Sequence, residues 1–413
     1  MPDSGGTLLT LDVLKALVEG DAVAIRGAAT LEPAGGPGDK VFPPSHSVDK
    51  NERRPGSKYA SEKRRIDGRD VECVLLDSVQ SQANRMEAAL QALWAARRIA
   101  LPVIAVDFSG CAPDVGLVTS LSAPHRIADA LLRDSLIDGT LFRLSSLGRS
   151  FTDATATNAG PLFKVCPTGL VFGVWDSTGP KGGLGSKFAR ALVSEIVGVG
   201  ATAGVKTASR IDPTGIVTKA ADILEAADPN ERWTHDPALA KQDKGKALKL
   251  GDGRVSEVNH SNIPPSIDTL AGGVTIDYAS HTVVLSLAAL RKLSFAVGDI
   301  EARTVLAALG LLAILAAESR GHDLRSRCLL VPQKGKALRL EAVRRDGTTE
   351  TLSVDLEAAI ALFNRAVAEL PEDLAFSAKP GDPLATLSPS PKLAYLVRRS
   401  RELAATGADV EGA

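Results

Sequence analysis

The sequence has few of the residues that build metal centres and disulfide frameworks. Its four cysteines are scattered and form no pair with metal-ligand spacing. They are Cys73, Cys111, Cys166 and Cys328. Scattered single cysteines are typical of a reducing compartment, so we expect a cytoplasmic protein.

The six histidines give no metal site either, because they are isolated along the chain. His322 stands beside Asp323 but lacks the further ligands that a metal nuclease would need. Asp277 and His281 flank a predicted turn, a position that is more often structural. We therefore expect no catalytic residue set, no metal ion and no cofactor.

Aromatic residues and net charge are scarce as well. Aromatic residues make up 4% of the chain and the formal net charge is −1. This balance argues against a protein that coats DNA through a generally basic surface. It leaves nucleic-acid binding open, because a local basic face on a neutral chain is sufficient.

A leader and a long hydrophobic run are also missing. The first residues have no basic segment followed by an apolar core, so we expect no signal peptide. The most apolar run, residues 305–317, is too short to span a bilayer. We interpret it as a buried core helix and expect no membrane partner.

What is present is enough apolar sequence for a full core, since 44% of the 413 residues are hydrophobic. Periodicity predicts helices at residues 8–18, 79–97, 124–133, 184–197, 299–319, 356–370 and 392–405. It predicts strands at residues 21–30, 73–76, 103–108, 168–175, 205–210, 274–278, 282–287, 327–331 and 337–344. The irregular alternation favours an α+β fold with a split β-α-β arrangement in one elaborated domain, residues 1–413.

Two basic segments interrupt this pattern. Residues 33–69 are rich in Pro, Gly, Lys and Arg, which predicts a long flexible basic insertion around Tyr59. Within residues 320–346 we expect a basic hairpin, with Lys334 and Lys336 at its tip.

The most informative segment is glycine-rich and covers residues 172–196. We expect a strand that ends at Trp175, a polar turn, and a helix that opens near Leu184. Glycines let backbone N–H groups approach an anion, and a helix N-terminus adds a favourable dipole. Lys181, Lys187 and Arg190 supply positive charge, and the indole of Trp175 could stack on a base.

This segment matches none of the common catalytic or nucleotide motifs. It has no Gly-Lys-Ser/Thr triplet of an NTPase loop, and the dinucleotide fingerprint fails after residues 183–185. Ser177 is no nucleophile elbow, since Trp175 stands where a glycine is needed. An ordinary glycine-rich turn is an equally good alternative to an RNA or phosphate site.

Three further segments place polar or basic side chains at strand ends and helix starts: residues 76–87, 121–129 and 205–210. Such side chains often contact phosphates and sugars, and basic side chains at a helix start suggest an anionic partner. The alternatives are capping by Asp77 or Ser78, a surface His–Arg pair and a solvated strand face. The candidate residues are Ser81, Asn84, Arg85, His125, Arg126, Lys206 and Arg210.

The chain resembles the CRISPR-associated RAMP backbone protein of type I-U (I-G) systems in LLDSVQSQANRMEAAL, LSAPHRIADALLRDS and FGVWDSTGPKGGLGSKFARALVSEIVGVG, followed by KTASRID. The resemblance covers residues 65–212. It implies an RRM-like (ferredoxin-like) palm with large inserted finger and thumb elements. The thumb hairpin would be the Lys334–Lys336 turn or the basic loop near Tyr59.

The resemblance also implies partners: crRNA, target DNA, copies of the chain itself and other subunits of a Cascade surveillance complex. Copies would stack head to tail along the crRNA and hold it for pairing with target DNA. The implied RNA-binding residues are Ser81, Asn84, Arg85, His125, Arg126, Trp175, Ser177, Lys181, Lys187, Arg190, Lys206 and Arg210.

Catalysis is not expected. Related type III backbones cut target RNA with a loop aspartate, and Asp176 is the one residue here that could be tested for that role. The alternatives to a structural subunit are thus an RNA endonuclease that uses Asp176 and a module that binds a phosphate ligand.

Overall fold

The computed structural model describes residues 6–47, 58–176 and 186–405. The chain divides into two compact units, where the sequence had led us to expect one elaborated domain. Unit 1 consists of residues 1–46, 59–202 and 274–393, and unit 2 of residues 47–58, 203–273 and 394–413. Unit 1 mixes helices with a large sheet, so the predicted α+β class is confirmed.

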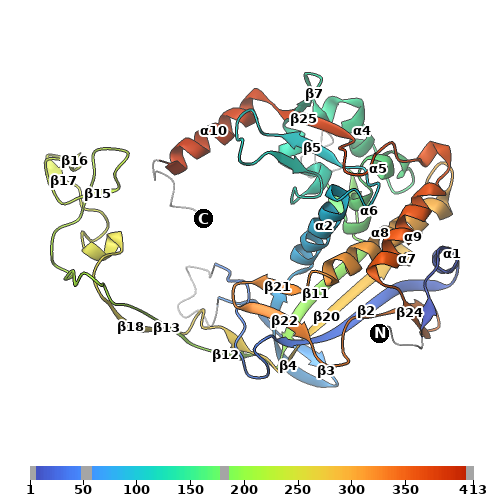
Figure 1. The fold of residues 1–413 in the computed structure, drawn as a ribbon, viewed down its shortest axis with the longest axis horizontal. Coiled ribbons are helices and arrows are strands. Elements are labelled where there is room, and N and C mark those ends of the chain that lie inside the picture. The colour runs from blue at the N-terminus through green and yellow to red at the C-terminus, as the bar shows by residue number, and fades with distance from the viewer. Residues whose placement is uncertain (1–5, 48–57, 177–185, 406–413) are drawn as a thin grey trace. The chain divides into compact units, whose positions relative to one another are not determined.

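The main sheet of unit 1 has the strand order β1-β24-β23-β2-β20-β11-β4-β3, with β22 beside the far end of β2 and β21 beside β22 (Figure 1). The strands are β1 (Thr7–Leu8), β2 (Ala22–Pro33), β3 (Ser61–Ile66), β4 (Arg69–Asp77), β11 (Leu192–Val199), β20 (Tyr278–Ser286), β21 (His322–Arg325), β22 (Cys328–Pro332), β23 (Arg339–Arg344) and β24 (Thr349–Ser353). All neighbours are antiparallel except β1 and β24, which are parallel. Strand β20 is therefore central, paired along its length with both β2 and β11.

Helices pack on this sheet and on one another. The longer ones are α1 (Leu11–Glu19), α2 (Val79–Ala95), α8 (Asp299–Glu318) and α9 (Leu356–Ala368). Helix α8 contacts α1, α2, α9 and β20 (Figure 1). It is apolar and long enough to cross a membrane by composition, but most of it is buried inside unit 1, as predicted for a core helix. Gly310 lets α8 approach β20, because a Cβ there would lie 2.9 Å from Leu285 Cδ1.

A second, smaller sheet of unit 1 has the order β6-β5-β25-β7-β8. Its strands are β5 (Ile104–Asp107), β6 (Leu117–Thr119), β7 (Ser135–Ile137), β8 (Thr140–Leu141) and β25 (Ala385–Pro389). Short helices and turns fill the chain around it, namely η1 (Arg126–Ala128), α3 (Ala130–Arg133), η2 (Phe142–Leu144), α4 (Ser146–Thr152), α5 (Gly160–Val165), α6 (Pro167–Phe172), α7 (Leu287–Leu290) and η4 (Glu372–Leu374).

Several predicted elements are confirmed with their ends. Helix α1 begins after Thr10, whose side chain accepts a hydrogen bond from Val13 N. Helix α2 begins after Ser78, which caps Ser81 N. These caps satisfy N–H groups that have no partner within the helix. The predicted helices at 299–319, 356–370 and 392–405 correspond to α8, α9 and α10 (Pro391–Ala405).

Two predictions around the glycine-rich segment are wrong. Residues 168–175, predicted as a strand, form most of helix α6 and then the short strand β9 (Val174–Trp175). The helix ends at Gly173, whose φ of 81° suits glycine. The helix predicted at 184–197 is absent from the described residues 186–197, which instead form β10 (Lys187–Phe188) and most of β11. Strand β11 is held by ladders on both sides, and it contains the valines and isoleucine that strands favour.

Both predicted hairpins are wrong as well. Residues 278–286 form one continuous strand, β20, because it has a partner on each side, and β19 (Val274–Thr275) is separate from it. Strands β22 and β23 each pair with β2 and not with each other. Lys334 and Lys336 lie in the connection between them. Residues 61–66 of the expected flexible insertion form the edge strand β3.

Unit 2 is built on an antiparallel ribbon of β13 (Lys206–Arg210) and β18 (Ile263–Asp268). Two smaller ribbons follow, β14 (Leu224–Glu225) with β15 (Trp233–Thr234) and β16 (Gln242–Asp243) with β17 (Lys246–Ala247). The strand predicted at 205–210 is thus confirmed. Asp212 closes the loop after β13 by accepting hydrogen bonds from the Thr214 hydroxyl, Thr214 N and Ser261 N, which lower the pKa of Asp212 to about 2.

Candidate functional site

A two-stranded ribbon flanks the glycine-rich segment. In it, Trp175 of β9 stands opposite Lys187 of β10, with the Lys187 Nζ 5.2 Å from the centre of the indole ring. The other pair of the ribbon, Val174 and Phe188, is buried and anchors it. Trp175 is 54% exposed and Lys187 is also exposed. The indole ring of Trp175 and the ammonium group of Lys187 thus lie together at the protein surface, on a ribbon held in place by its buried pair.

The ribbon leads into residues 177–185, which lie outside the described residues. Two predicted contacts, Ser177 and Lys181, are among them. At the base of the ribbon, Asp176 N donates to Ser186 O, and the Ser186 hydroxyl donates to Ala154 O. The Asp176 carboxylate is buried and pairs with Arg143 at 2.8 Å. Asp176 therefore holds the base of the ribbon in place and does not face solvent.

Arg126 is buried and positions the start of the same ribbon. Its Nε and Nη2 donate to the two carboxylate oxygens of Glu87 at 2.6 and 2.7 Å, and its Nη1 donates to Gly173 O. Burial raises the pKa of Glu87 to about 7, while the charge and hydrogen bonds of Arg126 act in the opposite direction. The guanidinium of Arg126 is thus bound by acceptors inside the protein. The expectation that a basic side chain at a helix start indicates an anionic partner is wrong for Arg126, because this residue lies in the short 3₁₀ turn η1.

Arg190 lies beside this ion pair. Its Nη1 is buried and has no hydrogen-bond partner among the residues that the structure describes. Burial lowers the pKa of Arg190, and the positive charge of Arg126 adds to that effect. A buried guanidinium N–H without an acceptor is rare in native proteins and calls for an explanation. An anionic oxygen supplied by a ligand would satisfy this group.

The residues of the first polar segment lie on α2. Arg85 Nε donates to Asp77 Oδ2 at 2.9 Å, and its Nη atoms donate to the carbonyls of Asp323 and Leu324. Arg85 therefore joins α2 to β21. Ser81 is half-buried and Asn84 is exposed.

Three other candidates are at the surface or in unit 2. His125 is exposed next to η1, which contacts β9. In unit 2, Lys206 Nζ pairs with Asp268 at 3.2 Å, and Arg210 Nη2 lies 3.9 Å from Asp212 Oδ2. Unit 1 thus brings together η1, the ribbon and Arg190, whereas Lys206 and Arg210 form a separate group on β13.

The ion-pair partners of the candidate residues were missed by the sequence analysis. Asp77 and Glu87 lie in the first polar segment but were not recognised as partners of Arg85 and Arg126, and Arg143, the partner of Asp176, lies outside all the segments singled out. One signal was present in the sequence: Glu87 falls on the buried face of α2 beside Met86 and Leu90, where an acid needs a partner.

Comparisons with known proteins add a family. Residues 25–203 match the model of a family described as CRISPR-associated protein GSU0053. No curated protein matches the chain. The crystal structure of Csc2 from Thermofilum pendens aligns with 97% of this chain and 81% of that chain, at 12% identity and a TM-score of 0.26. At that TM-score the likeness supports no structural argument.

The family match covers the region that contains the three resembling stretches around LLDSVQSQ, LSAPHRIAD and WDSTGPKGG. It includes α2, η1 and both strands of the ribbon. The predicted resemblance to a CRISPR-associated family is therefore confirmed over residues 25–203, which are similar to the CRISPR-associated GSU0053 proteins.

Proposed function

We propose that this chain is a crRNA-binding backbone subunit of a type I-U (I-G) Cascade complex. The observation that carries the proposal is the exposed pair of Trp175 and Lys187 on an anchored ribbon. Bases of any sequence stack on an exposed aromatic ring, and lysine and arginine neutralise phosphates. Such a surface suits a protein that holds a guide RNA without reading its sequence.

The strand order supports an RRM-like palm. The elements β2, α2, β11, β20, α8 and β23 follow one another in the chain, with insertions between them. In the sheet, β2 lies between β20 and β23, and β11 flanks β20. A ferredoxin-like sheet has this arrangement, with the first strand between the third and the fourth and the second beside the third.

Two insertions in this palm are long enough to be the finger and thumb elements. Residues 96–191 separate α2 from β11, and most of unit 2, residues 203–273, separates β11 from β20. We assign the thumb to residues 203–273, because they carry an antiparallel ribbon of their own, β13 with β18. The Lys334–Lys336 turn and the loop near Tyr59 are the less favoured candidates.

The RNA contacts that we propose in unit 1 are the cationic and polar side chains around the ribbon. Arg190 would supply its unpartnered N–H to a phosphate. Arg85 and Arg126 have a positioning role in this proposal, since protein acceptors bind both guanidinium groups. The proposed contacts are Ser81, Asn84, His125, Trp175, Ser177, Lys181, Lys187 and Arg190, with Lys206 and Arg210 in unit 2.

We further propose that the subunit has no catalytic role. The competing endonuclease would need Asp176 at the surface, but its carboxylate is buried against Arg143. The hypothesis of a phosphate-ligand module relied partly on a helix N-terminus after the glycines, but no helix begins at the described residues that follow them. Extraction of short RNA with a repeat-derived end from the complex purified with its neighbours would favour the structural subunit over both alternatives.

The site is tested by RNA retention in the purified complex at several salt concentrations. Lys187→Ala should weaken binding equally for all guide sequences and reduce the salt slope by about one. Trp175→Ala should cost about 1–3 kcal/mol per stacked base with an unchanged salt slope. Matched controls are Lys164→Ala on α5 and Trp233→Ala in unit 2. Unchanged retention in the Trp175→Ala/Lys187→Ala double variant would refute the site.

A further inference from the structure

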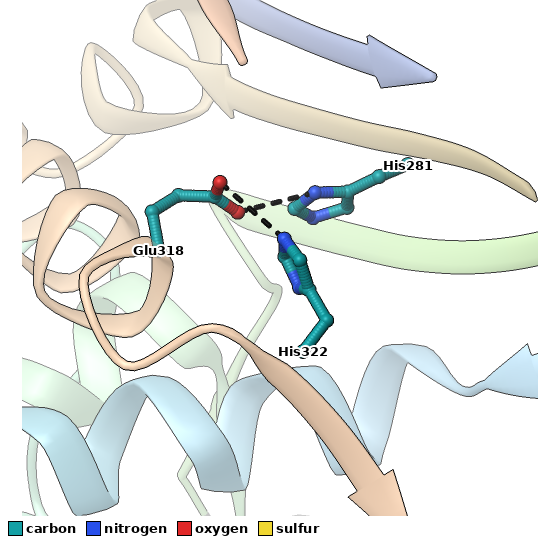
Figure 2. A group of neighbouring side chains, drawn as sticks. All are labelled: His281, Glu318 and His322. Carbon is teal, nitrogen blue, oxygen red and sulfur yellow. Dashed lines mark ion pairs between the residues drawn. The ribbon is translucent and has the colours of Figure 1, made fainter. Parts of the chain in front are cut away.

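Three side chains that no RNA contact uses meet on the helical side of the main sheet (Figure 2). His281 comes from β20, Glu318 is the last residue of α8, and His322 is the first residue of β21. His281 Nδ1 lies 3.2 Å from Glu318 Oε1, and His322 Nε2 lies 3.5 Å from Glu318 Oε2. One nitrogen or oxygen of each residue lies within 4.8 Å of the other two.

These distances fit ligands of a single ion. Nitrogen and oxygen ligands about 2.0–2.2 Å from a tetrahedral zinc ion lie roughly 3.3–3.5 Å from one another. Two imidazoles and one carboxylate form a known set for zinc and for non-haem iron. Magnesium and calcium prefer oxygen ligands alone, so the two imidazoles favour a transition metal.

The hydrogen bonds behind His281 fix which of its nitrogens is available. The Asp77 carboxylate pairs with Arg85 and Arg325, and its Oδ2 accepts a hydrogen bond from the Gln82 amide nitrogen at 2.6 Å. The Gln82 oxygen therefore faces Ser194, whose hydroxyl donates to it at 3.0 Å. With its one proton used, the Ser194 hydroxyl accepts from His281 Nε2 at 3.0 Å.

His281 Nδ1 is consequently the free nitrogen of the ring. It is buried, and it has no hydrogen-bond partner although the Glu318 carboxylate is close by. A lone pair there would face a carboxylate, which is unfavourable unless a cation lies between the two. The chain from His281 through Ser194 to Gln82 resembles the outer-shell partners that orient metal-bound histidines.

Space for a further ligand adjoins the cluster. A cavity of about 300 Å³ is lined by all three residues and also by Gln82 and Arg85. A metal ion held by three protein ligands would thus keep a position open for water on the cavity side.

We propose that His281 Nδ1, the Glu318 carboxylate and His322 Nε2 bind one divalent transition-metal ion of the zinc class. The ion joins β20, the end of α8 and the start of β21. This site is independent of the RNA contacts, and its role is to fix those three elements together. The alternative is an imidazole–carboxylate cluster without an ion, and the experiment below distinguishes the two.

The test uses the full chain, stripped with a chelator and titrated with Zn²⁺ against a chromophoric competitor and with Co²⁺ by visible absorption. We expect one ion per chain, a Co²⁺ spectrum of nitrogen and oxygen ligands, and a Tm that rises on Zn²⁺ addition. Glu318→Gln and His322→Gln should weaken binding by more than about 100-fold, since loss of an outer-shell partner alone costs about 10–100-fold. Ser194→Ala, which leaves all three ligands, should fall in that smaller range.

His235→Gln, an exposed histidine of unit 2, is the matched control and should bind Zn²⁺ like the unchanged chain. Far-UV circular dichroism checks that each variant folds. Failure of the unchanged chain to bind Zn²⁺ or Co²⁺ at micromolar concentration would overturn the proposal and leave the cluster without an ion. Equal affinity in the Glu318→Gln and His322→Gln variants would also overturn it, because the ion would then lie elsewhere.

Discussion

Arg126 illustrates how a cation that resembles a nucleic-acid contact in the sequence becomes part of the protein interior. It follows His125 in a polar segment, and the nearest acid in the chain, Asp129, accepts hydrogen bonds from the backbone N–H groups of His125 and Leu131. In the fold, Glu87 binds it through both carboxylate oxygens from a position 39 residues earlier in the chain. A buried acid and base of this kind depend on each other, since either alone would be an uncompensated charge.

Replacing Arg126 should therefore destabilise the protein in a pH-dependent way. Arg126→Met should lower the free energy of unfolding by about 3–5 kcal/mol at pH 8. The folded-state pKa of Glu87, about 7, exceeds its ordinary value of 4.5. Its contribution to stability is therefore complete below pH 4.5 and lost as the pH rises through 7. Removing Arg126 raises this pKa further, so the loss should be smaller at pH 5, as measured by urea unfolding.

The Arg126→Met/Glu87→Gln double variant is the control for this prediction. It has no carboxyl group at residue 87, so its own free energy of unfolding should lack the pH dependence that Glu87 causes. Its difference from the unchanged chain should then change with pH only because Glu87 titrates in the unchanged chain. A single variant whose destabilisation is the same at pH 5 and pH 8 would contradict the assigned role of Glu87.

At the residue scale, sequence predicts a helix cap better than an ion-pair partner. Ser78 was recognisable as a cap because a cap acts on an N–H three residues away. His281, Glu318 and His322 were dismissed or passed over because they come from three elements. The interpretation of His281 as a structural residue assumed a turn at residues 278–282, but these residues belong to the continuous strand β20.

At the scale of elements, the wrong predictions concern segments whose secondary structure is decided by pairing with strands far away in the sequence. Residues 184–197 contain alanine, leucine and glutamate at spacings that suit a helix, yet the part from Leu192 onward is a strand between β4 and β20. Elements with one strong local signal, such as α8 and β2, were predicted correctly. The short strands of the ribbon had no such signal, because residues 176–186 separate the two paired strands.

The close packing of α8 on β20 gives a prediction at this scale. Gly310→Val should destabilise the protein by about 1–3 kcal/mol, because the new side chain must displace Leu285 from its contact with the helix. The measurement is the midpoint of urea unfolding at constant m value. Gly110→Val is the control, since a Cβ at residue 110 meets nothing within 4 Å. Equal midpoints for the two variants would show that α8 and β20 are further apart.

At the scale of the whole molecule, net charge is a poor guide to function. A chain with net charge −1 can still present a local cationic group, as Lys187 and Arg190 do near the ribbon. The sequence predicted the α+β class from its periodicity, and it predicted the resemblance from segments within residues 25–203, which match the family model. It did not reveal the division into two units, because each unit is assembled from three separate segments of the chain.

Most of unit 2 should be removable without unfolding unit 1. Strands β11 and β20 are already paired up to Val199 and Tyr278, so a short Gly-Ser turn can replace residues 203–273. The Tm of the shortened chain should remain within a few degrees of that of the full chain. Its RNA affinity should fall, and the dependence of that affinity on salt concentration should decrease by up to about two charges, because Lys206 and Arg210 are lost. If the shortened chain does not fold, the two units depend on each other for stability.

The sheet order also has a consequence for biosynthesis. The ladder between β2 and β20 joins Arg26 to Val284, so the N-terminal strand has no central partner until more than half of the chain has left the ribosome. Until then, β2 exposes an unpaired edge, and pairings this distant in sequence form slowly. Production in cells should therefore depend on chaperones, and truncated chains that end before residue 278 should aggregate.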